Sequence, residues 1–359
     1  MPQSYRLSSE RRNFSLDDID EMTEEKAMLF IAKSRWGSES EQVCPECGSF
    51  SKHYYKKTRK QWRCKHCNHT FSVTSSSVFA HKKIKYKKLL RLLFMFCNSA
   101  KGVSATELSG ILGLSQKSSW LLCHKIREGL LRSRDESPLS GLIHIDGAYF
   151  GGKRRHGRKR RYRIAHKAYE ARIATKGKVK LPLSPIQKRN LYKRKKNRRV
   201  VMSLREISSK SGQGATKTRI AVTRAEDEAN VIKLCERFVA KGSTIWSDEH
   251  KAYNKLQSNY KHESVEHSEE FMSESGVHNN QAESYNSRLR RAEYGTFHGM
   301  RPQYMLDYAQ EMAWREDTRR DTLLDQLSSL IRCVFSVGES VWWRGYHQGV
   351  RRNDELLAF

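Results

Sequence analysis

Four cysteines in two closely spaced pairs constrain the fold of this chain more than any other feature. The pairs are Cys44-Pro-Glu-Cys47 and Cys64-Lys-His-Cys67, with sixteen residues between them. Two thiolates that are two residues apart on a tight turn can reach one ion from the same side, and a second such turn completes a tetrahedron. The spacing is typical of zinc sites. We therefore expect Cys44, Cys47, Cys64 and Cys67 to hold a structural zinc ion, with no ligand position left open for catalysis.

A redox-active pair is the alternative interpretation of a Cys-x-x-Cys motif. Two pairs in a strongly basic chain favour zinc instead, and the polar N-terminal residues give no reason to expect secretion or a disulfide framework. The other cysteines are scattered among apolar residues and are expected to be packed free thiols: Cys97, Cys123, Cys235 and Cys333.

The charge of the chain indicates a polyanionic partner. The net charge is +29 over 359 residues, and aromatic residues make up 10% of the sequence, so the chain has material for a core and is not a disordered polycation. Nucleic acid is the expected partner. The longest apolar run, from Leu89 to Cys97, is broken by Arg91 and is far shorter than the roughly 20 residues that a membrane helix needs. We therefore expect no membrane partner.

Most of the excess charge is concentrated in one segment. Between Lys153 and Arg199 there are 21 Lys or Arg residues and one acid. We interpret 153–199 as a basic loop or insertion that contacts phosphates, because such repulsion destabilises a compact fold unless a polyanion relieves it. A solvated, self-repelling loop is the alternative. The expected phosphate contacts are Arg158, Lys159, Arg160, Arg161, Lys195 and Lys196.

Residues 84–135 have the pattern of a helix-turn-helix. An amphipathic helix is expected at 86–98, a second helix begins with a Ser104 cap, and Gly113-Leu-Ser115 forms a tight turn before a third helix at 116–131. An ordinary helical hairpin is the alternative. If the motif binds DNA, the recognition helix starts with Gln116, Lys117, Ser118 and Ser119.

The rest of the chain predicts an α/β fold. A short helix is expected at 15–35 and a small β-ribbon at 40–80 around the cysteines. After Pro138 the pattern changes to strands and later helices, which together indicate an α/β layer. The expected strands are 142–146, 199–204, 219–223 and 243–248, and the expected helices are 225–240, 280–291, 302–317 and 320–335.

Three acids are candidates for a catalytic site. Asp146 and Asp248 each end an expected strand, and Glu283 lies on an expected helix. On that helix Asn280, Glu283 and Arg290 fall on one stripe, so a carboxylate, an amide and a cation can share a face. Each acid has a simpler explanation: a strand-end Asp is often a turn residue, and Glu283 can cap the helix or pair with Arg290. The joint pattern is the stronger observation.

Converging carboxylates in a basic setting suit phosphodiester chemistry. Cleavage of a phosphodiester puts negative charge on the attacking and leaving oxygens, and two divalent cations about 3.5–4 Å apart stabilise both. Such cations prefer oxygen ligands.

These motifs together resemble the bacterial insertion-sequence transposases that combine an N-terminal zinc ribbon with an RNase H-like DDE catalytic domain. The resemblance covers about residues 15–345 and includes Asp146-Gly-Ala-Tyr-Phe-Gly-Gly152, Ser247-Asp-Glu-His-Lys-Ala-Tyr253 and His278-Asn-Asn-Gln-Ala-Glu283. The first motif departs from the family in having Gly147 where a glutamate is common. A second departure is Asn286 in place of an aromatic residue.

The resemblance implies a function and a set of roles. Asp146, Asp248 and Glu283 would bind two Mg²⁺ or Mn²⁺ ions per active site, Arg290 would be the basic residue on the same helix, and Asn280 its polar partner or the third metal ligand. The protein would bind the terminal inverted repeats of its insertion sequence, cleave DNA strands and transfer the 3′-hydroxyl ends to target DNA. It would act as a homodimer or larger oligomer on double-stranded DNA, in the bacterial cytoplasm and associated with the nucleoid.

The expected organisation follows from the same resemblance. A mixed sheet flanked by helices forms the RNase H-like domain, preceded by a zinc ribbon and a helix-turn-helix. Two other functions remain open: a DNA-binding regulator without enzymatic activity, and an RNase H-like nuclease without strand transfer. The expected segments are an N-terminal helical segment at 1–40, the zinc ribbon at 41–80, the helix-turn-helix region at 84–135, the catalytic domain at 140–320 with the insertion at 153–199, and a C-terminal helical segment at 321–359.

Overall fold

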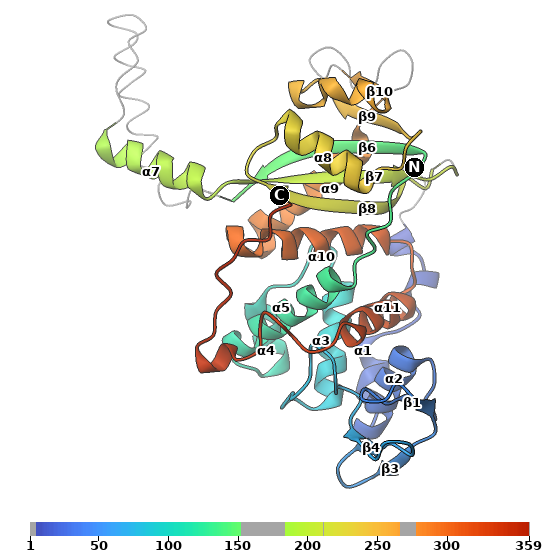
Figure 1. Ribbon diagram of the computed structural model, residues 1–359. Coiled ribbons are helices and arrows are strands. Elements are labelled where there is room, and N and C mark those ends of the chain that lie inside the picture. The colour runs from blue at the N-terminus through green and yellow to red at the C-terminus, as the bar shows by residue number, and fades with distance from the viewer. Residues whose placement is uncertain (1–4, 152–183, 211, 266–277, 359) are drawn as a thin grey trace, which may run out of the picture.

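A computed structural model describes residues 5–151, 184–210, 212–265 and 278–358. Figure 1 shows a sheet with its helices at one end of the molecule and the cysteine-containing ribbon at the other. The helices are α1 (Leu16–Glu21), α2 (Glu24–Trp36), α3 (Tyr86–Asn98), α4 (Ala105–Leu112), α5 (Gln116–Arg132), α7 (Pro185–Lys196), α8 (Glu228–Phe238), α9 (Asn280–Arg291), α10 (Met305–Asp317) and α11 (Leu323–Ser336). The strands are β1 (Gln42–Val43), β2 (Phe50–Ser51), β3 (Tyr54–Lys56), β4 (Gln61–Arg63), β5 (Thr70–Phe71), β6 (Leu142–Phe150), β7 (Arg199–Ile207), β8 (Ala215–Thr223), β9 (Thr244–Asp248) and β10 (Lys261–Val265).

The largest sheet in the described residues has five strands in the order β10-β9-β6-β7-β8. Strands β6, β7 and β8 are antiparallel neighbours, whereas β9 is parallel to both β6 and β10. This mixed sheet with helices on both faces confirms the predicted α/β class and the RNase H-like arrangement. The crossover between β8 and β9 contains α8, as a parallel connection requires.

Alternate residues of β6 and β7 point into two different cores. On one face, Ile143 and Ile145 pack with α8 residues and the buried ring of Tyr253. On the other face, Ala148 and Phe150 pack with α9 and α10. Because side chains alternate along a strand, Asp146 lies on the α9 face and Gly147 on the α8 face.

The helix-turn-helix region has the predicted helices. The Ser104 hydroxyl accepts a hydrogen bond from the Glu107 amide at the start of α4, and Ser115 accepts one from Ser118 at the start of α5. Gly113 ends α4 with φ of +56°, the left-handed conformation that glycine adopts most readily. Helix α5 packs against α10 and α11, and α10 in turn packs against β8, which ties this region to the five-stranded sheet.

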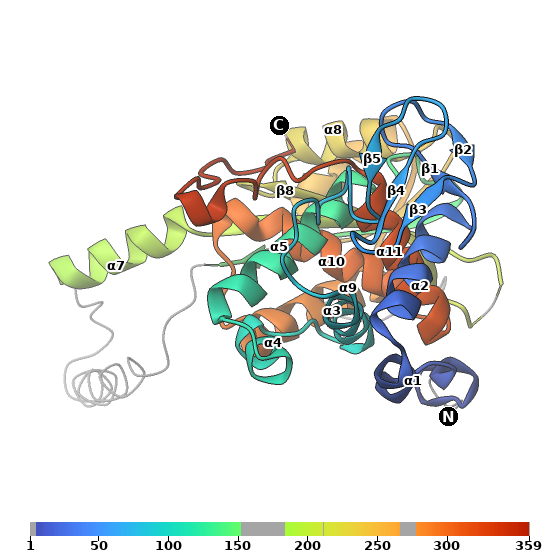
Figure 2. The ribbon, with the colours of Figure 1, turned by 90° about the horizontal axis from the view of Figure 1, so that it is seen from below.

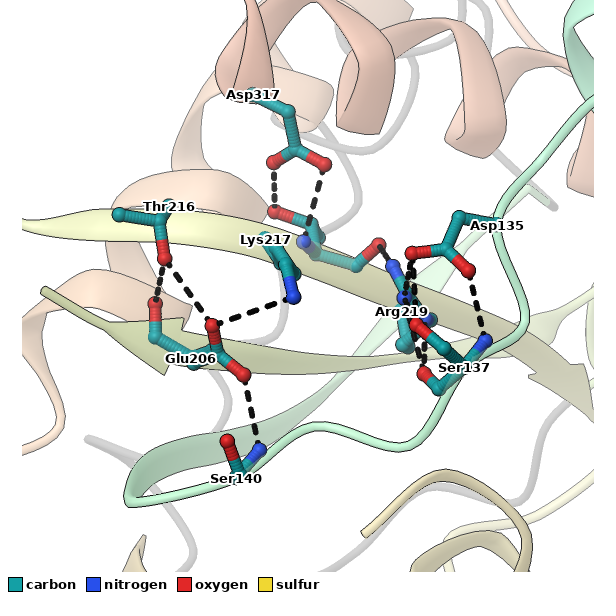
Figure 3. A network of polar contacts seen from close by, with 9 residues as sticks. Asp135, Ser137, Ser140, Glu206, Thr216, Lys217, Arg219 and Asp317 are labelled. Carbon is teal, nitrogen blue, oxygen red and sulfur yellow. Dashed lines mark hydrogen bonds and ion pairs between the residues drawn. The ribbon is translucent and has the colours of Figure 1, made fainter. Parts of the chain in front are cut away.

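A network of polar contacts fastens the segment between α5 and β6 to the sheet, as Figure 3 shows. Arg219 on β8 donates to the carbonyl of Ser137 and pairs with Asp135 at 2.7 Å. On the same strand, the backbone and hydroxyl of Thr218 donate to the carboxylate of Asp317 at the end of α10. These bonds hold α10 against β8.

The structure corrects the predicted bounds of several helices and strands. The strand predicted at 142–146 continues to Phe150, because the antiparallel ladder with β7 extends through Phe150. The helix predicted at 15–35 is two helices, α1 and α2, since Thr23 caps a new helix. Part of the expected basic loop is the regular helix α7, while 152–183 lie outside the described residues. Strand β10 was not predicted.

Nowhere in the described ranges is a helix both long and apolar enough to span a bilayer.

Candidate functional site

The four paired cysteines converge on one point. The sulfurs of Cys44, Cys47, Cys64 and Cys67 all lie within 4.8 Å of one another. The Sγ atoms of Cys44 and Cys67 are 3.6 Å apart, as are those of Cys47 and Cys64. A tetrahedral zinc ion with bonds of about 2.3 Å places its sulfur ligands about 3.8 Å apart. The cluster therefore fits a structural zinc ion, and its four thiol ligands leave no position for a substrate.

Aromatic side chains join the zinc ribbon to the helix before it. The ring of Trp36 at the end of α2 meets Trp62 of β4 at a centroid distance of 5.5 Å and Phe71 of β5 at 6.2 Å. A cluster of large rings is an effective core for strands of two or three residues. The ribbon is thus held by the cysteine cluster on one side and by α2 on the other.

Asp146 and Asp248 lie at equivalent positions on adjacent parallel strands. The register pairs His144 of β6 with Trp246 of β9, and each aspartate comes two residues later. Neighbouring strands are about 4.8 Å apart, and residues in register project to the same face. Strand β9 ends at Asp248 while β6 continues to Phe150, so the two aspartates lie on neighbouring strands at the place where β9 ends. Asp146 itself is inside β6 and does not end it.

Two amides bind the helix of Glu283 to this part of the sheet. The Asn279 side chain, fully buried, donates to the carbonyl of Ile145 at 2.8 Å. The Asn286 side chain donates to Oδ2 of Asp146, also at 2.8 Å. Glu283 lies between these residues on the same side of α9, because positions three or four apart share a helix face. The helix therefore brings Glu283 to the aspartates, although its side chain is exposed.

The other predicted residues of α9 have different surroundings. Asn280 is exposed, and the amides that contact β6 are those of Asn279 and Asn286. Arg290 is also exposed, and among the described residues no acid lies within ion-pair distance of it. The sequence carried a weak signal for Asn286, since the residue differs from the aromatic expected there.

Burial raises the pKa of Asp146 to about 7, and neighbouring acids add to this shift. The contributing charges are those of Asp248, Glu226 and Glu283, in decreasing order, while the hydrogen bond from Asn286 opposes them. In the described residues, neither Asp146 nor Asp248 has a Lys or Arg nitrogen within 4 Å. Among the described residues, Asp146 and Asp248 therefore concentrate negative charge without a Lys or Arg partner to balance it, which is the environment of a cation site.

Glu226 is an acid of this site that sequence reasoning missed. It precedes the N-cap of α8, and its Oε1 accepts a hydrogen bond from the Tyr253 hydroxyl at 2.7 Å. Burial raises its pKa, and Asp248 contributes to the shift. Glu226 lies in the loop before α8, at the start of the helix expected at 225–240, and no hydrophobic periodicity pointed to it as a site residue.

The side-chain oxygens of the acids at this site are of the kind that binds a hard divalent cation, but they do not converge as closely as the cysteine sulfurs do. Within the described residues, the cysteine cluster is the one group of three or more His, Cys, Asp or Glu side chains whose ligand atoms lie within 4.8 Å of one another. Carboxylate and amide oxygens are what Mg²⁺ and Mn²⁺ prefer.

Only part of the first turn of α5, the predicted recognition helix, is exposed to solvent. Gln116 and Lys117 are exposed, and Ser118 is half-buried with its amide bonded to Ser115. Ser119 is fully buried, so the expectation that it contacts DNA does not hold in this structure. The reason is the helical phase: Ser119 lies on the side of α5 that faces the protein interior.

The exposed end of α5 borders a cavity of about 990 Å³. Cations surround an aromatic ring on its wall: the Lys117 ammonium is 5.5 Å and the Arg351 guanidinium 4.1 Å from the centre of the Tyr346 ring. Trp120 and Arg301 also line this cavity. Cations together with aromatic faces are typical of nucleic-acid surfaces.

The described part of the basic segment projects from the end of the sheet. Figures 1 and 2 both show α7 extending away from the body of the molecule. It carries six Lys or Arg residues and no acid, and its side chains from Ile186 to Tyr192 are exposed. Lys195 and Lys196 lie in its last turn, whereas Arg158, Lys159, Arg160 and Arg161 lie outside the described residues.

Comparison with known proteins identifies two families in this chain. Residues 22–70 match the transposase zinc-ribbon domain, and residues 138–317, half of the chain, match the ISXO2-like transposase domain. No curated protein and no solved structure matches. The first match contains the cysteine cluster, and the second contains both aspartates and α9. The chain therefore belongs to the ISXO2-like family of insertion-sequence DDE transposases, with an N-terminal zinc ribbon.

Proposed function

We propose that this transposase binds the terminal inverted repeats of its insertion sequence, cleaves DNA strands there and transfers the 3′-hydroxyl ends to target DNA. One observation carries the proposal: Asp146 and Asp248 lie on adjacent strands in register, next to the helix of Glu283. These acids are about 100 and 35 residues apart in the chain, and their positions on neighbouring elements support phosphodiester chemistry with bound cations.

The three acids are proposed to hold two Mg²⁺ or Mn²⁺ ions. When bound, the ions stabilise the charge that develops on the attacking and leaving oxygens. Asn286 orients the Asp146 carboxylate by its hydrogen bond, and Asn279 fixes the start of α9 on β6. Arg290 is proposed to bind a phosphate, because it is exposed on the same helix without an acidic partner in the described residues. Asn280 remains the alternative third ligand.

DNA contacts are proposed at three places. Gln116, Lys117 and Ser118 begin α5, where the cavity with Arg351 supplies further cations. Helix α7, with Lys195 and Lys196, is proposed to reach phosphates away from the sheet, together with the basic residues 158–161. If these residues bind phosphates, the logarithm of the affinity should fall with the logarithm of salt at a slope of about −0.9 per phosphate contacted.

We also propose a role for each segment of the chain. The zinc ribbon at 41–80 and the helix-turn-helix at 84–135 are proposed to recognise the ends, and the sheet region at 140–320 to perform the chemistry. Joining two ends needs at least two active sites, so we propose a homodimer or larger oligomer on DNA, acting at the nucleoid.

The test is a strand-cleavage and strand-transfer assay with oligonucleotides that carry the inverted repeats flanking the gene. Wild-type protein with Mg²⁺ should nick the donor and join it to a target duplex, while Asp146→Asn and Asp248→Asn bind the same DNA without cutting it. Cleavage without joining would favour the nuclease. No cleavage by the wild type, with equal binding by both variants, would favour the regulator.

A further inference from the structure

The three predicted acids do not account for all the carboxylates at this site. Glu226 comes from the short connection between β8 and α8, on the opposite face of the sheet from α9. Its charge nevertheless acts on both Asp146 and Asp248. The two faces can meet here because β9 ends at Asp248, whereas β6 continues to Phe150. A carboxylate from the α8 side can therefore reach the same point as one from the α9 side.

Glycine at position 147 provides the room for this carboxylate. A Cβ atom at Gly147 would lie 2.4 Å from Oε1 and 2.8 Å from Oε2 of Glu226. The φ angle of Gly147 is not in the left-handed region, so the backbone itself does not require glycine. Any side chain at 147 would push the Glu226 carboxylate away from β6. The residue directly after Asp146 thus sets the position of Glu226.

A buried tyrosine holds the carboxylate from the other side. Tyr253 lies in the 3-10 helix Lys251–Ser258, which follows Asp248 almost directly, and its ring is fully buried. Its hydroxyl donates to Oε1 of Glu226, and among the described residues Oε2 accepts no hydrogen bond. Neither oxygen has a Lys or Arg partner within the described ranges. One oxygen is fixed by the protein and the other is left for a ligand.

We propose that Glu226 is a fourth carboxylate ligand of the divalent-cation site formed by Asp146 and Asp248, held in place by Tyr253 and by the space at Gly147. The inference rests on the proposed function of that site. The competing explanation is structural: Glu226 would accept the hydrogen bond of the Tyr253 hydroxyl only to stabilise the 3-10 helix, and would not contact a cation.

A Mn²⁺ titration of the full-length, zinc-loaded protein separates these explanations, with free Mn²⁺ measured by electron paramagnetic resonance. Glu226→Gln removes the charge but keeps the oxygen that Tyr253 bonds, and it should weaken Mn²⁺ binding by at least about tenfold. Glu228→Gln is the matched control: Glu228 is two residues away and pairs with Lys255 at the surface, so its variant should bind Mn²⁺ as the wild type does.

Gly147→Ala gives a second test that keeps every carboxylate. The new methyl group would displace Glu226, so Mn²⁺ binding should weaken in the same direction as in Glu226→Gln. Tyr253→Phe should give a smaller loss, because Glu226 stays but loses its fixed orientation. Folding of each variant is checked by its melting temperature, and the conclusion is drawn from whichever of the variants at 226 and 147 folds.

The outcomes distinguish this inference from the proposed function. Unchanged Mn²⁺ affinity in folded Glu226→Gln or Gly147→Ala, together with loss of binding in Asp146→Asn, would overturn the role of Glu226 and leave the active site standing. Unchanged affinity in Asp146→Asn would overturn the site itself. A Mn²⁺ loss in Glu226→Gln but not in Glu228→Gln supports the inference.

Discussion

Buried carboxylates occur in two regions of this protein with opposite surroundings. Between α5 and α10, the Glu311 carboxylate pairs with Arg127 and with Arg315, each at 2.7 Å, and all three side chains are almost fully buried. At the edge of the sheet, Asp146 is also largely buried, but its nearest charges are other acids. Burial alone would raise the pKa of both groups.

The neighbouring charges decide the direction in each case. Burial opposes ionisation of Glu311, but Arg127 and Arg315 outweigh it and lower the pKa of Glu311 below its usual value. The pKa of Asp146 rises to about 7 instead. The first region carries its own cations and is complete as folded. The second gathers negative charge that a cation from solution would balance, and this difference marks Asp146 and its neighbours as a candidate functional site without reference to sequence motifs.

The largest expected effect comes from removing the zinc ion that the four paired cysteines are expected to hold. Structural zinc contributes about 10–16 kcal/mol to small zinc-finger peptides at neutral pH, so a strong chelator should unfold the ribbon around 41–80 while the sheet stays folded. Thiol titration and limited proteolysis measure this. Four newly reactive thiols and cleavage confined to the ribbon are expected; reactive thiols with zinc still bound would contradict the assignment.

Replacing Asp146 should separate activity from stability. Asp146→Asn keeps an oxygen for Asn286 but removes one negative charge, so strand cleavage should fall by at least about 1,000-fold, or about 4 kcal/mol. Stability in urea without divalent cations should stay equal or rise, since repulsion from Asp248 is relieved. Asp17→Asn, at an exposed position, is the control. A clear loss of stability would mean that Asp146 is paired after all.

Replacing Glu311 should do the reverse. Glu311→Gln leaves the guanidinium groups of Arg127 and Arg315 buried without a counter-charge and should cost about 3–5 kcal/mol of unfolding free energy. Glu39→Gln, which breaks the exposed pair with Lys33, should cost about 0–1 kcal/mol. Urea unfolding of both variants measures the difference. Equal small effects would remove the contrast between the two regions.

Asp317 is intermediate between Glu311 and Asp146. Its carboxylate has hydrogen-bond donors, the backbone amide and the hydroxyl of Thr218, but no guanidinium ion pair among the described residues. Burial raises its pKa to about 6 although Thr218 donates to it twice. The folded state then holds this proton more tightly than the unfolded state, so the stabilisation is complete below about pH 4 and is lost as the pH rises through 6. Between pH 5 and 7 the stability of the wild type should fall relative to that of Asp317→Asn, by on the order of 1 kcal/mol. Parallel curves would show that Asp317 stays ionised.

The sequence predicted the elements of the fold better than the contacts between them. The spacing of the cysteines and the positions of Asp146, Asp248 and Glu283 on two strands and a helix follow from short-range patterns. Glu226 could not be found this way, because its place depends on where the crossover from β8 enters α8 and on where β9 ends. The burial of Ser119 likewise depends on which faces of α5 pack against the neighbouring helices.

The packing of α11 has a consequence for how the chain is made. Phe335 and other α11 side chains complete the core of the first 135 residues, and the Arg11 guanidinium donates to the Asp321 carbonyl at 2.9 Å. During translation the N-terminal region cannot close until about residue 335 has left the ribosome. At about 5–20 residues per second, this delays its folding by about 10–40 s after residue 135 is made. The N-terminal region of a nascent chain would therefore reach its folded form only after the five-stranded sheet has been synthesised.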